Sequence, residues 1–128
     1  MTDHISTHQA EEDARNEAIL IWVNGRLVPK AQALVSVYDS GFMLGDGVWE
    51  GIRLYNNRWS FLGEHVDRLF EAAKAIDLDI GMTKDAVISA VSETQAANGM
   101  TDDAHARLMV TRGVKTRPFQ HPKLSQQG

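Results

Sequence analysis

The sequence predicts an α+β domain in which an antiparallel β-sheet carries two helices packed on one side. Residues 48–55 and 104–112 alternate between apolar and polar side chains with the period of a strand. Two segments between them, 64–76 and 83–98, have the period of a helix instead. Because two consecutive helices separate the strands, rather than alternating strand and helix units, we expect the sheet to be antiparallel.

The composition is that of one compact, soluble domain. The chain has 128 residues, of which 43% are apolar, and this is enough for a core. A net charge of -4 argues against nucleic acid or an anionic membrane surface as the main partner. Cysteine is absent and the five histidines lack metal-ligand spacing, so we expect no disulfide and no metal site. No apolar run resembles a signal peptide or a membrane span, which favours a cytoplasmic protein.

The N-terminal part predicts a tail and then a hairpin. Residues 1–17 are polar and acidic, so we expect a flexible tail, followed by one small α+β domain over 18–128. Asn24-Gly25 between two apolar runs is a strong hairpin signal. Pro29 ends the second strand because proline cannot donate to a sheet ladder. Residues 33–37 are a candidate for one further short strand.

A glycine-rich turn precedes the first long strand. Its glycines and the apolar residues between them are Gly41, Phe42, Met43, Leu44, Gly45 and Gly47. We expect a short helical turn closed by glycines that are free to adopt positive φ. Alternation in the strand that follows places Trp49, Gly51 and Arg53 on one face. The opposite face receives Val48, Glu50, Ile52 and Leu54, and a turn at Asn56-Asn57 leads to a return strand over 58–62.

The helices and the last strand have equally clear faces. The apolar stripe of the first helix is Val66, Leu69, Phe70, Ala73 and Ile76, with His65 and Arg68 beside it. Thr83 is the expected N-cap of the second helix, which ends at Asn98-Gly99. One face of the last strand carries His105, Arg107, Met109 and Thr111. Residues 114–128 have no periodicity and indicate a loop, which suggests the front part of a longer protein.

Two features indicate an anion site, and each has a structural alternative. Gly51 between Trp49 and Arg53 predicts a notch for a small anionic ligand, although tryptophan stacked on an exposed arginine stem would give the same pattern. Arg68 can bind a phosphate or carboxylate, but pattern alone favours an ion pair with Glu64 or Glu71. The arginines that would converge on an anion, or else lie solvated on the surface, are Arg53, Arg68, Arg107, Arg112 and Arg117.

A family resemblance becomes specific in the segment SGFMLGDGVWEGIRLYNNRWSFLGEHVDRLFEAAKAI. This segment resembles the N-terminal domain of the class IV aminotransferases, which are fold-type IV pyridoxal 5'-phosphate enzymes. The resemblance covers residues 21–122, including WVNG and VTRG, and its most specific parts are GDGVWEGIR and EHVDRL. It implies transfer of an amino group between an amino acid and a 2-oxo acid by a homodimer with sites near the subunit interface.

The resemblance also implies roles for single residues. Arg68 matches the arginine that holds the cofactor phosphate, which reverses the preference for a surface ion pair. Arg107 matches an arginine that accepts the distal carboxylate of glutamate in branched-chain enzymes, and Arg117 lies near the substrate-carboxylate arginine of D-amino acid aminotransferases. The remaining residues implied to line the substrate pocket are Trp49, Gly51 and Arg53, with Leu44 and His105 where branched-chain enzymes have tyrosines.

The family's catalytic lysine, which forms a Schiff base with the cofactor, belongs to a C-terminal domain. The lysines of this chain, which match none of its motif positions, are Lys30, Lys74, Lys84, Lys115 and Lys123. We therefore expect no catalytic residue here, a chain truncated before the lysine domain, and no activity from the chain alone. Branched-chain transamination is favoured for the intact enzyme. The alternatives are a D-amino acid aminotransferase, an (R)-amine transaminase, an aminodeoxychorismate lyase, or a non-catalytic truncated domain.

Overall fold

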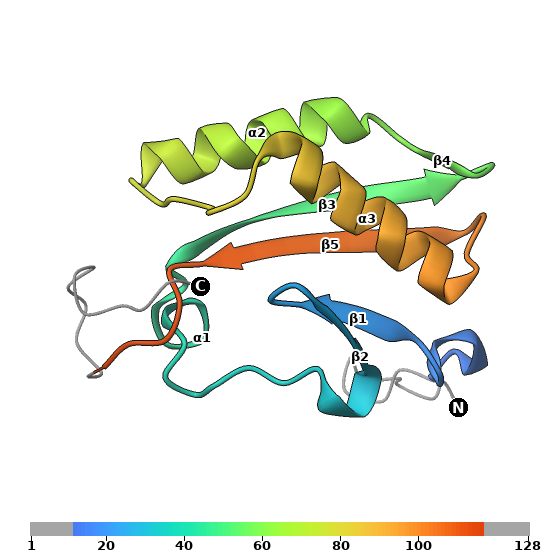
Figure 1. The fold of residues 1–128 in the computed structure, drawn as a ribbon, viewed down its shortest axis with the longest axis horizontal. Coiled ribbons are helices and arrows are strands. Elements are labelled where there is room, and N and C mark those ends of the chain that lie inside the picture. Colours follow the sequence, from blue (N-terminus) through green and yellow to red (C-terminus); the bar gives the residue numbers. More distant parts are fainter. Residues whose placement is uncertain (1–11, 117–128) are drawn as a thin grey trace, which may run out of the picture.

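The structure is a computed structural model that describes residues 12–116. Its main sheet is antiparallel with the strand order β4-β3-β5, formed by β3 (Gly47–Tyr55), β4 (Arg58–Trp59) and β5 (Ala104–Thr111). Two helices, α2 (Leu62–Ala75) and α3 (Lys84–Asn98), pack on one side of this sheet (Figure 1). The predicted α+β class with its antiparallel sheet and one-sided helices is confirmed.

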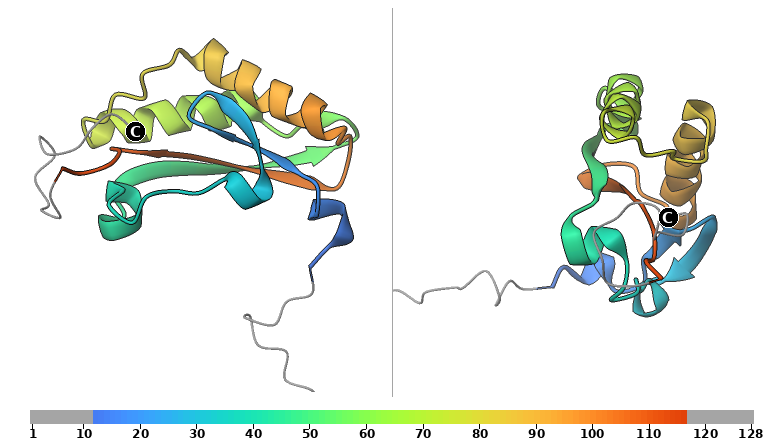
Figure 2. Two further views of the ribbon diagram at one scale, coloured as in Figure 1. Left: turned by 60° about the horizontal axis from the view of Figure 1, so that its bottom comes forward. Right: turned by 90° about the vertical axis from the view of Figure 1, so that its left-hand side faces the viewer.

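The core lies between the helices and the sheet (Figure 2). Its buried apolar side chains are Val48, Ile52 and Leu54 of β3, Val66, Leu69 and Ala73 of α2, Val87 and Val91 of α3, and Leu78 and Ile80 between the helices. The predicted alternation of β3 is therefore confirmed. The last residue of the predicted apolar stripe of α2 is not in the core. Ile76 is the C-cap residue of the helix and is 39% exposed. Within residues 12–116, no helix is long and apolar enough to cross a membrane.

The N-terminal hairpin forms as predicted but is a sheet of its own. Strands β1 (Leu20–Val23) and β2 (Arg26–Pro29) pair with each other, so the described strands form two sheets instead of one. The hairpin is held to α3 by Asn98, whose side chain accepts from Leu20 N at 2.7 Å and donates to Leu20 O at 2.9 Å. A side-chain amide thus replaces a strand ladder as the link between the two parts.

Several elements differ from the sequence prediction. The expected strand over 33–37 is absent. A short 3-10 helix, η3 (Lys30–Gln32), precedes these residues, and their backbone has no neighbouring strand with which to pair. The return strand ends at Trp59, since Phe61 adopts a φ of 55° and caps α2, which begins at Leu62. β5 ends at Thr111 rather than at Arg112.

The glycine turn is docked onto the end of β5. It contains α1 (Ser40–Leu44), and of its glycines only Gly45 has positive φ, at 66°. A Cβ on Gly47 would lie 2.6 Å from Val110 O, so this glycine permits close approach of two strands rather than an unusual φ. Val114, expected in a loop, instead forms a β-bridge with Asp39. Residues 117–128 of that expected loop lie outside the described residues.

The described part of the expected tail makes local contacts. Residues 14–16 form a 3-10 turn, η2 (Ala14–Asn16). Arg15 binds Asp13 at 2.6 Å and Asp103, before β5, at 3.0 Å, and all three side chains are exposed. Residues 1–11 lie outside the described part of the chain, so the flexible tail and the domain boundary stay predictions.

Candidate functional site

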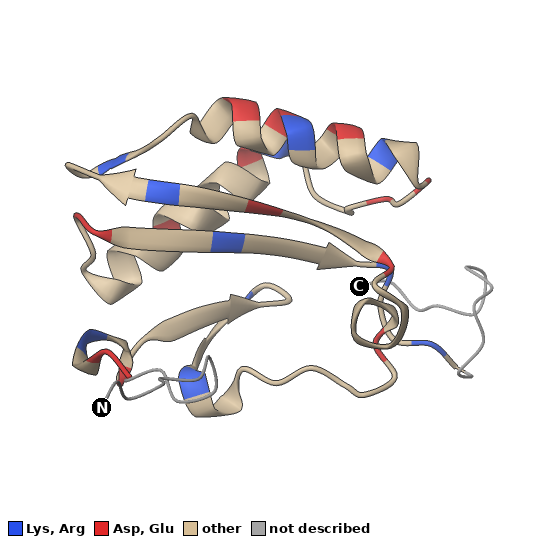
Figure 3. Cartoon of the chain, turned by 180° about the vertical axis from the view of Figure 1, so that it is seen from behind, with Lys and Arg blue, Asp and Glu red and all other residues tan. Residues whose placement is uncertain are grey.

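The face of the main sheet that points away from the helices carries most of the predicted site residues. We call this surface, which faces the viewer in Figure 3, the open face. Its residues are Trp49, Gly51, Arg53, His105, Arg107 and Met109. The register pairs Trp49 with Met109, Gly51 with Arg107 and Arg53 with His105 across β3 and β5. Trp49 is 58% exposed and Met109 is 61% exposed. The open face is therefore accessible to a ligand or to another part of a larger protein.

The centre of the open face is a stack of arginine on tryptophan. The guanidinium carbon of Arg107 lies 4.3 Å from the ring centroid of Trp49. Such a contact contributes about 0.5–2 kcal/mol and leaves the N–H groups at the guanidinium edge available. The tryptophan-on-arginine alternative is thus present, but with Arg107 of the neighbouring strand instead of Arg53. Among residues 12–116, neither arginine forms an ion pair.

The expected notch at Gly51 is filled by a ring. A Cβ at this position would lie 2.8 Å from His105 Nε2 and 3.8 Å from Trp49 Cζ3. Gly51 therefore lets the imidazole lie against the strand, and the prediction of an empty space between Trp49 and Arg53 is wrong. The flat rings of His105 and Trp49 border the position instead. Whether these residues bind substrate stays a prediction.

Arg68 has a different ion-pair partner from those expected. Its Nε donates to Glu50 Oε1 at 2.5 Å and its Nη2 to Glu50 Oε2 at 2.7 Å. The predicted pairing with Glu64 or Glu71 is wrong. Alternation places the Glu50 carboxylate on the buried face of β3, where α2 packs, and a buried carboxylate must be paired with a cation.

Glu50 is held from a second side by His65. The Nδ1 atom of His65 lies 2.7 Å from Glu50 Oε2, and the glutamate side chain is only 4% exposed. The hydrogen bonds from Arg68, and next those from His65, lower the pKa of Glu50 from 4.5 to about 2, against the opposing effect of burial. Sequence reasoning missed this residue as part of a site. The signal was a carboxylate in the otherwise apolar row Val48, Ile52 and Leu54.

Arg68 keeps donors free although it is paired. Arginine has five N–H donors, Glu50 accepts from two of them, and three therefore remain without a hydrogen bond inside the described chain. The side chain is 68% exposed, so these donors are accessible. The free side of a guanidinium matches two oxygens of a phosphate or carboxylate. Arg68 thus fits the phosphate of a cofactor.

The lowered pKa of Glu50 predicts a loss of stability in acid. A group with a depressed folded-state pKa stabilises the fold fully above its unfolded pKa and stops doing so as the pH falls through the folded value. We expect the free energy of unfolding to decline between about pH 5 and pH 2, and the Glu50→Gln variant to show a shallower decline. Urea denaturation at several pH values across this range measures the decline in the free energy of unfolding. Asp67→Asn, which removes a carboxylate from an exposed ion pair with Lys84, is the control, and equal slopes in both variants would contradict the role of Glu50.

Not all of the predicted arginines converge. Arg112 donates to Asp46 Oδ2 at 2.8 Å and to the carbonyls of Ile76 and Asp77 at 2.7 Å and 3.0 Å. It joins the end of β5 to the end of α2 and is only 14% exposed, so it has a structural role. Arg68 pairs on the helix side of the sheet, whereas Arg53 and Arg107 lie on the open face. Arg117 lies outside the described residues.

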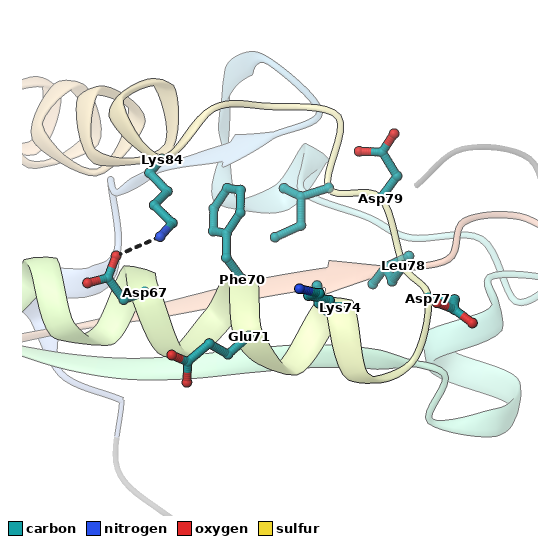
Figure 4. A pocket seen from close by; sticks show the side chains of 10 residues that line it. Asp67, Phe70, Glu71, Lys74, Asp77, Leu78, Asp79 and Lys84 are labelled. Atoms are coloured by element: carbon teal, nitrogen blue, oxygen red, sulfur yellow. Dashed lines mark ion pairs between the residues drawn. The ribbon is translucent and has the colours of Figure 1, made fainter.

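Leu44 and a pocket beside α2 are separate from the stack of Arg107 on Trp49. Leu44 is the last residue of α1, before the start of β3, and is 39% exposed. A pocket of about 540 Å³ opens beside α2 and the chain segment that follows it (Figure 4). Lys84 in its wall binds Asp67 at 3.0 Å and lies 5.8 Å from the ring centre of Phe70. None of the predicted site residues lines this pocket.

Comparison with known sequences identifies a family model and several relatives. Residues 47–125, more than half of the chain, match the family described as amino-transferase class IV. A putative branched-chain-amino-acid aminotransferase of Methanocaldococcus jannaschii is 48% identical over 94 residues, which cover 73% of this chain and 32% of that protein. Branched-chain-amino-acid aminotransferase-like protein 1 of Arabidopsis thaliana is 41% identical over 113 residues, 88% of this chain and 20% of that protein.

Two further similarities are to a second kind of aminotransferase and to a solved structure. D-alanine aminotransferase of Listeria innocua is 40% identical over 101 residues, 79% of this chain and 34% of that protein. The crystal structure of the T.th. branched-chain amino acid aminotransferase, complexed with N-(5'-phosphopyridoxyl)-L-glutamate, superposes with a TM-score of 0.71 at 32% identity. The match covers 77% of this chain and 34% of that one. The chain thus spans about a third or less of the length of each of these proteins.

Proposed function

Because the chain belongs to the class IV aminotransferases, we propose that it contributes the cofactor-phosphate contact and one wall of the substrate pocket to a pyridoxal 5'-phosphate-dependent transamination. The reaction moves an amino group between an amino acid and a 2-oxo acid, and branched-chain amino acids are the favoured substrates. The observation that carries this proposal is the open face, where Arg107 stacks on Trp49 beside Gly51.

The cofactor contact is assigned to Arg68. Its exposed guanidinium has three donors without a partner in the described chain, and this suits a phosphate group. When bound, pyridoxal phosphate supplies a ring that takes up negative charge from the amino acid's α-carbon. The contribution of this chain is to hold the cofactor phosphate and to orient the substrate. The family relationship also leads us to propose a homodimer that works in the cytoplasm.

The substrate contact is assigned to the open face. Trp49 offers an apolar wall for an aliphatic side chain, and the N–H edge of Arg107 suits the distal carboxylate of glutamate or 2-oxoglutarate. The other side chains proposed to shape the pocket are Arg53, His105 and Leu44, with Arg117 beyond the described residues. The similarity to two branched-chain aminotransferase relatives supports this choice. D-amino acid transamination is the second candidate, supported by the similarity to D-alanine aminotransferase.

The test is an activity screen of the full-length protein that contains this chain. With 2-oxoglutarate as acceptor, we expect faster turnover of L-leucine, L-isoleucine and L-valine than of D-alanine. Because Arg107 would contact only the distal carboxylate, Arg107→Ala should raise the KM for 2-oxoglutarate about tenfold or more, the cost of a lost charge-assisted hydrogen bond. The KM for L-leucine should change much less.

Two controls make the screen decisive. Arg58→Ala removes an exposed arginine of β4 from the same sheet and should leave both KM values unchanged. Faster turnover of D-alanine would replace the branched-chain assignment with the second candidate. Absence of transamination with every amino acid would overturn the proposal itself.

A further inference from the structure

We infer that Glu50 is a positioning residue, which holds the guanidinium of Arg68 so that its free N–H side is presented to a phosphate. This inference rests on the proposed function and deepens it, because it explains how an exposed arginine can provide a defined anion contact. It assigns a role to the one carboxylate in the apolar row of β3. Glu50 acts through Arg68 and is not itself expected to touch the ligand.

The geometry of the fork divides the donors of Arg68 into two sets. Glu50 accepts from Nε and Nη2, which lie along one side of the guanidinium. One Nη1 hydrogen and the remaining Nη2 hydrogen lie side by side at the end of the guanidinium, and together they form a second side that can bind two oxygens. One side of the group is therefore committed to the protein, and the other is available to a ligand.

Glu50 can act as a fixed support because its own position is well determined. It lies near the middle of β3, and its neighbours on the same face, Val48 and Ile52, are both in the core. Its Oε2 also contacts His65 Nδ1 at 2.7 Å. An ionised carboxylate only accepts hydrogen bonds, so the hydrogen between them must be on Nδ1. His65 and Arg68, three residues apart on α2, thus grip the same carboxylate.

An unsupported arginine would be a poorer anion site. Arg68 is 68% exposed, and a long exposed side chain without a partner samples many rotamers that ligand binding must then restrict. Holding the guanidinium in advance removes this entropic cost. A carboxylate next to the site also repels an anion, so positioning and charge act on binding in opposite directions. Removing the charge of Glu50 should therefore weaken phosphate binding if positioning dominates, and strengthen it if repulsion dominates.

The experiment measures the affinity of the 128-residue chain for pyridoxamine 5'-phosphate and for pyridoxamine by NMR titration. Both probes carry an amine and cannot form a Schiff base with lysine, so the difference between them reports the phosphate contact. We expect tighter binding of the phosphorylated probe. Glu50→Gln should weaken its binding about tenfold, the size of one lost charge-assisted hydrogen bond, without changing the affinity for pyridoxamine.

The matched control is Glu71→Gln, which removes a carboxylate of α2 that is not the ion-pair partner of Arg68. It should change the affinity less than about twofold, as expected of exposed surface charges. If Glu50 acts through Arg68, then Glu50→Gln should have no further effect in an Arg68→Ala background. Arg68→Lys keeps the charge but lacks the planar fork that fixes the orientation of the guanidinium on the carboxylate, so it should lose about as much affinity as Arg68→Ala.

Distinct results separate failure of this inference from failure of the proposed function. Unchanged or tighter binding in Glu50→Gln, with the wild-type chain still preferring the phosphorylated probe, would overturn the positioning role alone. Equal affinity of the wild-type chain for both probes would overturn the phosphate contact of Arg68. Wild-type affinity in Arg68→Lys would also refute positioning, and this variant alters an exposed side chain, so it remains informative if Glu50→Gln fails to fold.

Discussion

Replacing Arg112 with alanine is expected to lower the free energy of unfolding by about 3 kcal/mol, the range for breaking a largely buried ion pair with further hydrogen bonds. Arg112 is 14% exposed and Asp46 is 21% exposed. Their contact is joined by hydrogen bonds from Arg112 to the carbonyls of Ile76 and Asp77, at the end of α2. The variant leaves these carbonyls and the carboxylate without their donor.

Urea denaturation of the chain measures this effect, with Arg58→Ala as the matched control. Arg58 is exposed on β4, and its loss should change the free energy of unfolding by less than about 0.5 kcal/mol. Arg112→Lys tests the geometry, because a lysine ammonium cannot reach the three acceptors with a planar fork. It should recover only a small part of the loss. Similar stabilities for Arg112→Ala and Arg58→Ala would show that Arg112 does not hold the strand and helix ends together.

Replacing Gly47 with alanine should destabilise the fold by about 3 kcal/mol, the upper part of the range for steric overpacking. The new Cβ would lie 2.6 Å from Val110 O and 3.2 Å from Thr111 Cα. Both atoms belong to the backbone of β5, which pairs with β3 over eight residue pairs, from Gly47 and Thr111 to Leu54 and Ala104. The ladder cannot yield without losing hydrogen bonds, so the strand start must shift instead.

Gly63→Ala is the matched control for this substitution. Gly63 lies in α2, and a Cβ there would meet nothing within 4 Å. Alanine should therefore stabilise the fold by about 0.5–1 kcal/mol through its higher helix propensity. Thermal unfolding of both variants should give shifts of opposite sign. A Gly47→Ala protein as stable as the wild-type chain would refute the close approach of the glycine turn to β5.

Much of the fold could be predicted because its signals are local. Asn24-Gly25 specifies a hairpin from two adjacent residues, and both adopt positive φ. Thr83 caps α3 by accepting from Ala86 N, three residues away, and Gly99 ends it with a φ of 59°. Alternation in β3 assigned Trp49 and Arg53 to one face and Ile52 and Leu54 to the other without knowledge of any partner strand.

The errors arose where backbone groups need a distant partner. Residues 33–37 have apolar side chains typical of a strand, but Leu34 is 75% exposed and no neighbouring strand pairs with it. Val114 was assigned to a loop because a single bridge to Asp39 leaves no periodic pattern. Strand propensity indicates that a side chain would fit in a sheet. Whether a sheet edge lies beside that residue depends on the fold.

The sequence by itself determined the order of the elements, the faces of β3, β5 and α2, and the motifs that place the chain in its family. Only the tertiary structure determined that Glu50 holds Arg68, 18 residues away, and that Arg107 of β5 stacks on Trp49 of β3. Helix and strand periods act over a few neighbouring residues and can be read along the chain. Pairing of charges and rings depends on which elements pack against each other, and hydrophobic burial and strand register determine that packing.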